Sequence, residues 1–162
     1  DSTGKTVDFK NTILIMTSNI GSQYLLEGID EKGNIKPEAE AMVMNDLRAH
    51  FRPEFLHRLD ETILFKPLTK ENITDIIDLM VADINKRLAD RELTIELTDT
   101  AKTFIVDHGY DPVYGARPLK RFLQKHVETL AAKMILGDKV HMGDRIVIDT
   151  SEDNSKLIGY TE

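Results

Sequence analysis

The sequence predicts an α/β segment followed by an α+β domain of helices and short strands. Two observations predict this. A continuous apolar run at residues 12–17 is typical of a strand buried on both faces of a parallel sheet. After Pro67 the apolar residues recur instead at three- and four-residue spacings, which indicates amphipathic helices. We expect three parts: a first unit over 1–66, a second over 67–150, and a tail over 151–162.

The first unit is predicted to contain two strands separated by a helix. The first strand, at 12–17, is broken by polar residues from Ser18 to Ser22, and a loop follows. A proline at the first helical position and two acidic residues in the first turn predict a helix from Pro37, ending before Pro53. The remaining predictions are a loop at 23–36, a short helical turn at 53–59 and a second strand at 62–65.

The second unit is predicted to be mainly helical. Thr69 is a plausible cap for a helix that runs to Leu88, and Thr98 or Asp99 for a helix that closes at Gly109. A longer amphipathic helix ends at Gly137. Short strands are predicted at 93–97, 145–149 and 156–160.

Composition bounds the function. The 162 residues include 41% hydrophobic and 30% charged residues, which is typical of a soluble globular protein. The net charge of −7 argues against nucleic-acid binding, and the lack of an 18-residue apolar run argues against a membrane span. Cysteine is absent, which excludes disulfides and thiolate zinc and fits a cytoplasmic location.

Several familiar sites are not supported. Gly4-Lys5-Thr6 resembles the end of a phosphate-binding loop, but only three residues precede it and a strand follows, so we interpret it as a turn. The five histidines form no metal-binding pattern, so no metal site is predicted. No G-x-S-x-G motif is present.

Three polar positions remain as candidates for nucleotide chemistry. Asn19 follows the first strand, where α/β sheets bind ligands, although it or Ser18 could simply cap the next turn. Arg58 follows a rigid proline turn and suits phosphate, unless it only pairs with Asp60 or Glu61. Arg117 begins a helix with other cations in its first turns, an arrangement that an anion would stabilise.

The alternative interpretation of Arg117 is an ion pair with a nearby carboxylate. Asp107 and Asp111 are the candidates, and the turn Asp111-Pro112-Val113-Tyr114 is expected to fix the start of the helix. From the sequence alone, anion binding and ion pairing are equally supported.

Taken together, three stretches resemble the second nucleotide-binding domain of the Clp ATPases, closest to the ClpB type. They are Ile15 to Asn19, Phe51 to Asp60 and Gly109 to Arg121, in the family's order and spacing, and the resemblance covers residues 3–150. It implies a fold: the C-terminal remnant of an AAA+ large α/β subdomain, followed by the small helical subdomain.

The resemblance also implies roles and partners. Asn19 would be the sensor-1 residue, Arg58 the arginine finger acting on ATP of the neighbouring subunit, and Arg117 the sensor-2 arginine that contacts the nucleotide. The family's partners would be a hexameric ring of identical subunits, unfolded or aggregated client proteins and a co-chaperone system.

Two departures from the family pattern matter. His57 stands where the family usually has asparagine before the finger arginine. The phosphate-loop lysine and the acids that bind magnesium are not in this sequence, so we expect no ATP hydrolysis by the chain alone. A strand that would separate 12–17 from 61–66 is also missing, and these segments are expected to pair by rearrangement or with another copy.

Two alternatives remain to a disaggregase. A ClpA- or ClpC-type unfoldase would carry an aliphatic-glycine-aromatic or -leucine tripeptide for docking to its protease. Residues 20–50 contain no such tripeptide. A non-catalytic oligomerisation module would show no nucleotide effect.

Overall fold

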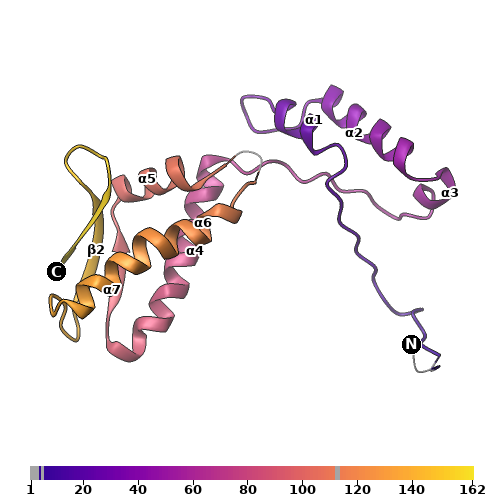
Figure 1. Cartoon of the computed structure of the whole chain (residues 1–162). Coiled ribbons are helices and arrows are strands. Elements are labelled where there is room, and N and C mark those ends of the chain that lie inside the picture. The colour runs from indigo at the N-terminus through magenta and orange to yellow at the C-terminus, as the bar shows by residue number, and fades with distance from the viewer. Residues whose placement is uncertain (1–3, 5, 112–113) are drawn as a thin grey trace.

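In the computed structural model of the chain, the helical second unit holds the main core and the first unit extends away from it (Figure 1). The structure describes residues 4, 6–111 and 114–162. Lys5 of the predicted N-terminal turn, and Pro112 and Val113 of the predicted turn before Arg117, lie outside the described residues. Within the described parts, no helix combines the length and apolar character that crossing a membrane requires.

The first unit consists of an extended segment and three helices. Residues 13–19 run without helix or strand, and α1 (Ser22–Glu27) and α2 (Pro37–His50) follow and pack together. Their contact is close, because a Cβ on Gly28 would lie 2.1 Å from the Cβ of Ala39. Helix α3 (Pro53–Leu56) is the last helix of this unit.

The helices of the first unit agree with the sequence, and the strands do not. Helix α2 begins at Pro37 as predicted, and α3 confirms the helical turn after Pro53. The predicted loop at 23–36 is partly wrong, because α1 occupies its first residues. The predicted strands at 12–17 and 62–65 are wrong: both segments are extended but pair with no strand in the described chain.

Exposure shows why these two segments form no strand. Ile13 and Ile15 are 89% and 84% exposed, and Phe65 is 82% exposed. A strand needs a neighbouring strand for its backbone hydrogen bonds, and none of the described residues forms one beside these two segments. The predicted pairing by rearrangement within the chain is therefore not found.

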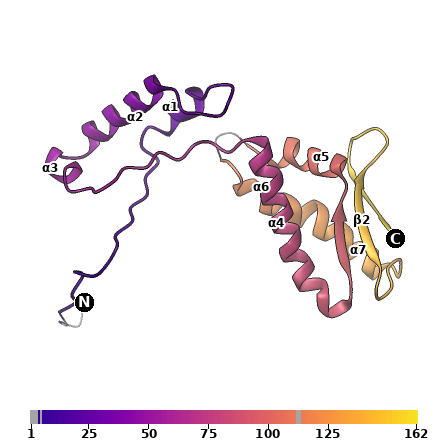
Figure 2. The same cartoon turned by 180° about the vertical axis from the view of Figure 1, so that it is seen from behind.

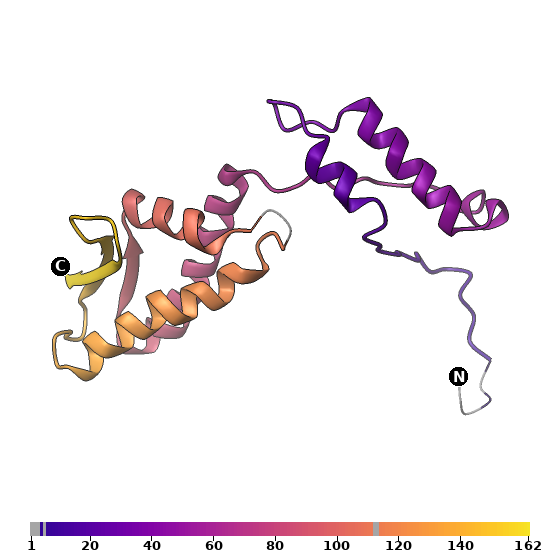
Figure 3. The same cartoon turned by 45° about the horizontal axis from the view of Figure 1, so that its top comes forward.

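The second unit is a three-stranded sheet covered by helices (Figure 3). Strand β1 (Thr94–Leu97) pairs in parallel with β2 (Arg145–Thr150), which pairs antiparallel with β3 (Leu157–Thr161). The strands confirm the three short strands of the prediction within one or two residues. Sheet and helices share one core, formed by the following buried residues: Ile73, Ile77, Val81, Ile84, Ile95, Leu97, Ala101, Ile105, Val106, Leu119, Leu123, Val127, Ala131, Met134, Ile146 and Ile148.

Two helices of this unit begin with side-chain caps. Helix α4 (Lys70–Leu88) starts with a capping box in which Thr69 and Asn72 bond each other's backbone. Helix α5 (Asp99–Gly109) is capped by Thr98, whose Oγ1 accepts the N–H of Ala101 at 3.2 Å. Of the two caps proposed for α5, Thr98 is therefore correct.

The long predicted helix is present but changes its winding. It runs as α6 (Arg117–Leu123), the π-helical segment η2 (Gln124–Glu128) and α7 (Thr129–Leu136). Its buried residues up to Ala131 are four apart: Leu119, Leu123, Val127 and Ala131. A four-residue spacing drifts around an α-helix by about 40° per step, and a wider π turn offsets this drift. The winding change thus keeps one apolar stripe on the core.

Candidate functional site

Helix α6, whose first residue is Arg117, begins at the end of the second unit that faces the linker, the segment that joins the two units ahead of α4 (Figure 1). Helix α5 ends at Gly109, where a Cβ would come within 3.1 Å of Leu119 and 3.2 Å of Phe122, so α5 and α6 approach closely. Between them, the N–H of Gly115 donates to the carbonyl of Asp111 at 2.7 Å, in a bridge that brings the chain back. Gly115 has a φ of +63°, a conformation that favours glycine.

Arg117 begins a helix whose ionisable side chains are all basic. Arg117 is exposed, and the first turn of α6 has no acidic residue, whereas Lys120 and Arg121 follow in its last turn. Asp107, one of the two carboxylates that could have paired with it, instead binds Lys70 at 3.1 Å. Positive charge at a helix N-terminus opposes the helix dipole, and a bound anion would reverse that effect.

Asn19 lies just before α1, and its neighbour forms the turn. Ser18 Oγ accepts the N–H of Ile20 at 3.1 Å, and the backbone carbonyl of Asn19 accepts the N–H of Ser22 at 3.2 Å. The exposed side chain of Asn19 is not used in these bonds. The turn therefore needs the backbone of Asn19 but not its amide.

Arg58 follows α3 in an exposed turn. Its N–H donates to the carbonyl of Phe55 at 3.1 Å, and no described residue forms an ion pair with its guanidinium. The predicted alternative of a pair with Asp60 or Glu61 is therefore not found. His57 lines a groove of about 350 Å³ between α2 and α3.

The chain does not bring Arg58 and Arg117 together. In all three views α3, which precedes Arg58, lies at the far end of the first unit from the second unit (Figure 2). The start of α6, with Arg117, lies at the opposite side, next to the linker. One chain therefore presents Arg58 and Arg117 at separate places.

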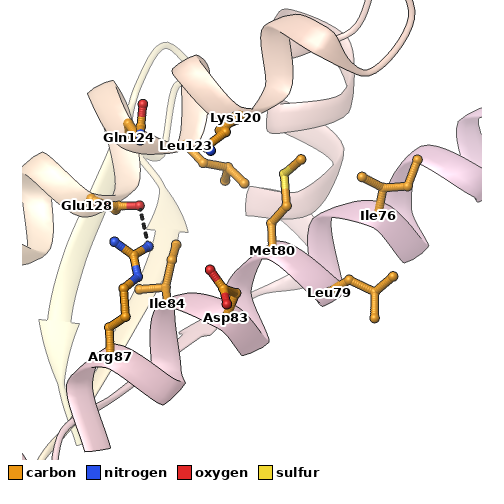
Figure 4. Close-up of a pocket in the computed structure, with 10 residues that line it drawn as sticks. All are labelled: Ile76, Leu79, Met80, Asp83, Ile84, Arg87, Lys120, Leu123, Gln124 and Glu128. Carbon is orange, nitrogen blue, oxygen red and sulfur yellow. Dashed lines mark hydrogen bonds and ion pairs between the residues drawn. The ribbon is translucent and has the colours of Figure 1, made fainter. Parts of the chain in front are cut away.

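Sequence reasoning missed a groove beside the second unit's long helix (Figure 4). About 610 Å³ in volume, it runs between α4 and α6–η2, and an ion pair of 2.9 Å joins Arg87 to Glu128 across it. The hydrogen bond to Glu128 raises the pKa of Arg87. Leu79, 71% exposed and off the core-facing stripe of α4, is the signal that could have revealed it. None of the three predicted site residues lines this groove.

Comparison with known proteins decides the family. The model of the C-terminal D2-small domain of ClpB protein matches residues 68–148, and the AAA domain (Cdc48 subfamily) model matches residues 1–62. The chain belongs to the ClpB family. The resemblance drawn from the sequence is thereby confirmed.

Individual relatives agree. The chain is 54% identical over all 162 residues to the chaperone protein ClpB of Bacillus cereus, and 54% identical over 148 residues to that of Enterococcus faecalis. It spans 18% and 17% of the length of these two ClpB proteins. It is also similar to a chain in the extended conformation of the Saccharomyces cerevisiae Hsp104:casein complex, with a TM-score of 0.77 and 31% identity over 97% of this chain and 27% of that one.

The match confirms the predicted fold class, a C-terminal part of an AAA+ domain. Nucleotide binding is a property of this ATPase family. Among residues 4, 6–111 and 114–162, no group of three or more His, Asp or Glu side chains is placed to hold a metal ion.

Proposed function

We propose that this chain supplies three residues to the ATPase of a ClpB-type protein disaggregase, whose remaining catalytic groups lie in other parts of the protein. Asn19 acts as sensor 1, Arg58 as the arginine finger and Arg117 as sensor 2. The observation that carries the proposal is Arg117 itself: an exposed guanidinium that begins α6, with no acidic residue in the helix's first turn.

Each residue suits its role chemically. Phosphoryl transfer spreads negative charge over the transferred group, so fixed donors around that group lower the barrier. An arginine supplies a permanent charge and a planar fork of donors, whereas the neutral amide of Asn19 can orient a water without adding charge. Arg117 lies in the second unit and Asn19 in the first, so loss of the phosphate that both contact would change the angle between the units.

The separation of Arg58 from Arg117 supports a finger that acts in trans. A residue at the far end of the first unit suits the nucleotide of a neighbouring subunit better than that of its own (Figure 2). In this proposal the subunits form a hexameric ring that unfolds aggregated client proteins together with a co-chaperone. The chain alone does not hydrolyse ATP, since its sequence lacks the phosphate-loop lysine.

Alanine substitutions in a full-length ClpB-type protein carrying this chain, with its other nucleotide-binding module inactivated, test the assignments. We expect Arg58→Ala and Arg117→Ala each to lower ATP hydrolysis by about tenfold or more, because each removes a positively charged side chain that stabilises the transferred phosphoryl group. Arg48→Ala and Arg91→Ala, at exposed arginines on α2 and η1 (Ala89–Arg91), are the matched controls. Unchanged hydrolysis in both test variants would favour a non-catalytic oligomerisation module.

Mixed rings test whether the finger acts in trans. One subunit type carries Arg58→Ala, and the other has its phosphate-loop lysine replaced; in a pure ring each should hydrolyse ATP far more slowly than the wild type. In mixed rings the second type supplies a finger to the first, so hydrolysis should rise. Mixed rings as slow as the pure ones would show that Arg58 does not serve a neighbour.

A further inference from the structure

The linker between the two units is held from both sides. Lys66 Nζ donates to Asn34 Oδ1 in the first unit at 2.7 Å, and the Tyr110 hydroxyl donates to the Leu68 carbonyl from the second unit at 3.1 Å. Pro67 lies between these contacts; its ring fixes its own φ and restricts the backbone of Lys66. The anchors of the two units are therefore only two residues apart along the chain.

Tyr110 and Arg117 lie at the ends of two helices, α5 and α6, that pack closely in the second unit. Tyr110 follows the last residue of α5, and its ring packs against the core of the second unit. Asp111 and Gly115, which lie in sequence between Tyr110 and the first residue of α6, Arg117, form a bridge with each other. The close contact of Gly109 with Leu119 holds the ends of α5 and α6 together.

The Leu68 carbonyl is available to anchor the end of the linker. It precedes Thr69, the cap of α4, so helix α4 does not use it, whereas the carbonyl of Thr69 accepts the N–H of Ile73. The ion pair of Lys70 with Asp107 reinforces the contact, but it is exposed and adds little. The hydroxyl of Tyr110 is thus the main polar contact of the linker's end with α5.

We propose that Tyr110 is a positioning residue for Arg117. Its hydroxyl fixes the last linker residue to the second unit, so that bending between the units is confined to the linker before Leu68. Arg117 and the end of the linker then rotate together. The position of Arg117 at the phosphate therefore determines the angle between the two units. This inference rests on the sensor role proposed for Arg117.

The first measurement tests the contact independently of catalysis. The chain has no cysteine, so single cysteines for spin labels can be introduced at two exposed positions, Ala49→Cys on α2 and Ala132→Cys on α7. In the intact ring of a full-length protein without other cysteines, the distance between the two labels measures the separation of the units. Tyr110→Phe keeps the ring that packs on the core and should broaden the distance distribution. Tyr114→Phe, which removes the hydroxyl of an exposed tyrosine nearby, should leave it unchanged. Equal widths for all three proteins would overturn the proposal.

The second measurement tests whether Tyr110 acts through Arg117. We expect Tyr110→Phe to lower kcat for ATP about threefold to fivefold, the effect of one lost hydrogen bond, and Tyr114→Phe to leave it unchanged. In the Arg117→Ala background, Tyr110→Phe should cause no further loss, because the residue that it positions is gone. Losses that multiply would overturn the proposal. If Arg117→Ala alone does not slow hydrolysis, the proposed sensor role fails, while the spin labels still decide whether Tyr110 holds the linker.

Discussion

At the residue scale, single polar side chains join parts of the second unit that are far apart in sequence. Asp149 Oδ1, at the end of β2, accepts hydrogen bonds from Thr98 Oγ1 at 2.7 Å, Thr100 Oγ1 at 2.6 Å and the N–H of Thr150 at 2.8 Å. The bonds from Thr100 and then Thr98 are the main reason that the pKa of Asp149 lies below its usual value of 3.8. One carboxylate thus ties the start of α5 to the sheet.

This contact predicts a pH-dependent stability. An unfolded Asp149 binds its proton at a higher pH than the folded one, so its contribution is complete above about pH 4 and is lost as the pH falls through the folded pKa. In thermal unfolding of the chain, Asp149→Asn should lower the midpoint temperature at pH 7. The difference in midpoint temperature between this variant and the wild type should become smaller below pH 4. Asp90→Asn, at an exposed carboxylate on η1, is the control and should change neither. A gap that stays constant with pH would contradict this role of Asp149.

At the element scale, a side chain takes the place of a missing strand. The outer edge of β1 would present unpaired backbone groups, but Asn85 on α4 bonds both groups of Ile95: Oδ1 accepts its N–H at 2.7 Å and Nδ2 donates to its carbonyl at 3.0 Å. An amide can satisfy a peptide unit in this way because it carries one acceptor and two donors. Helix α4 is thereby fixed to the sheet in one register.

Replacing this amide should destabilise the second unit. Asn85→Ala leaves two partly buried backbone groups without their partner, at a cost of about 1–3 kcal/mol in the free energy of unfolding. Urea unfolding followed by circular dichroism measures this change. Lys86→Ala, at the exposed neighbour on the same helix, should cost less than about 0.5 kcal/mol. A loss no larger than that of the control would show that Asn85 does not hold the sheet edge.

The elements also show how far the sequence alone can lead. Helices α2, α4 and α5 are predicted correctly because the first-turn proline of α2, the caps of α4 and α5 and the apolar spacing are local signals. The strands at 12–17 and 62–65 are not, because a strand depends on a partner strand, and no segment in the described part of the chain supplies one. For the site, the residue types and their motifs are visible in the sequence. The hydrogen bond between Tyr110 and Leu68 is not, because it joins residues 42 apart.

At the scale of the whole molecule, the first unit exposes an extended segment of apolar side chains that the second unit does not cover. Residues 13–16 form a continuous extended run of large apolar side chains, each more than half exposed. Such an unpaired edge is a template for pairing with another chain. In the intact AAA+ domain we propose that it pairs with strands from outside this segment.

The isolated chain should therefore self-associate. We expect the sedimentation coefficient of the wild type to rise with concentration, and Ile15→Lys to suppress this rise by placing a charge in the run. Leu136→Lys, at an exposed apolar residue on α7, is the matched control and should behave like the wild type. A wild-type chain that stays monomeric at all concentrations would contradict the prediction.

The π-helical turn at 124–128 has a consequence for insertions and deletions. It is equivalent to one additional residue in an α-helix, and one residue corresponds to a rotation of about 100°. Deleting Gln124 would restore regular α-helical hydrogen bonding and would leave the buried residues Leu119, Leu123, Val127 and Ala131 four, three and four apart, a spacing that a regular α-helix keeps on one face. The π turn therefore absorbs one residue without turning Arg117 relative to α7, so that losing this codon leaves the arginine in place, whereas a deletion in a regular stretch of the helix would rotate it by about 100°.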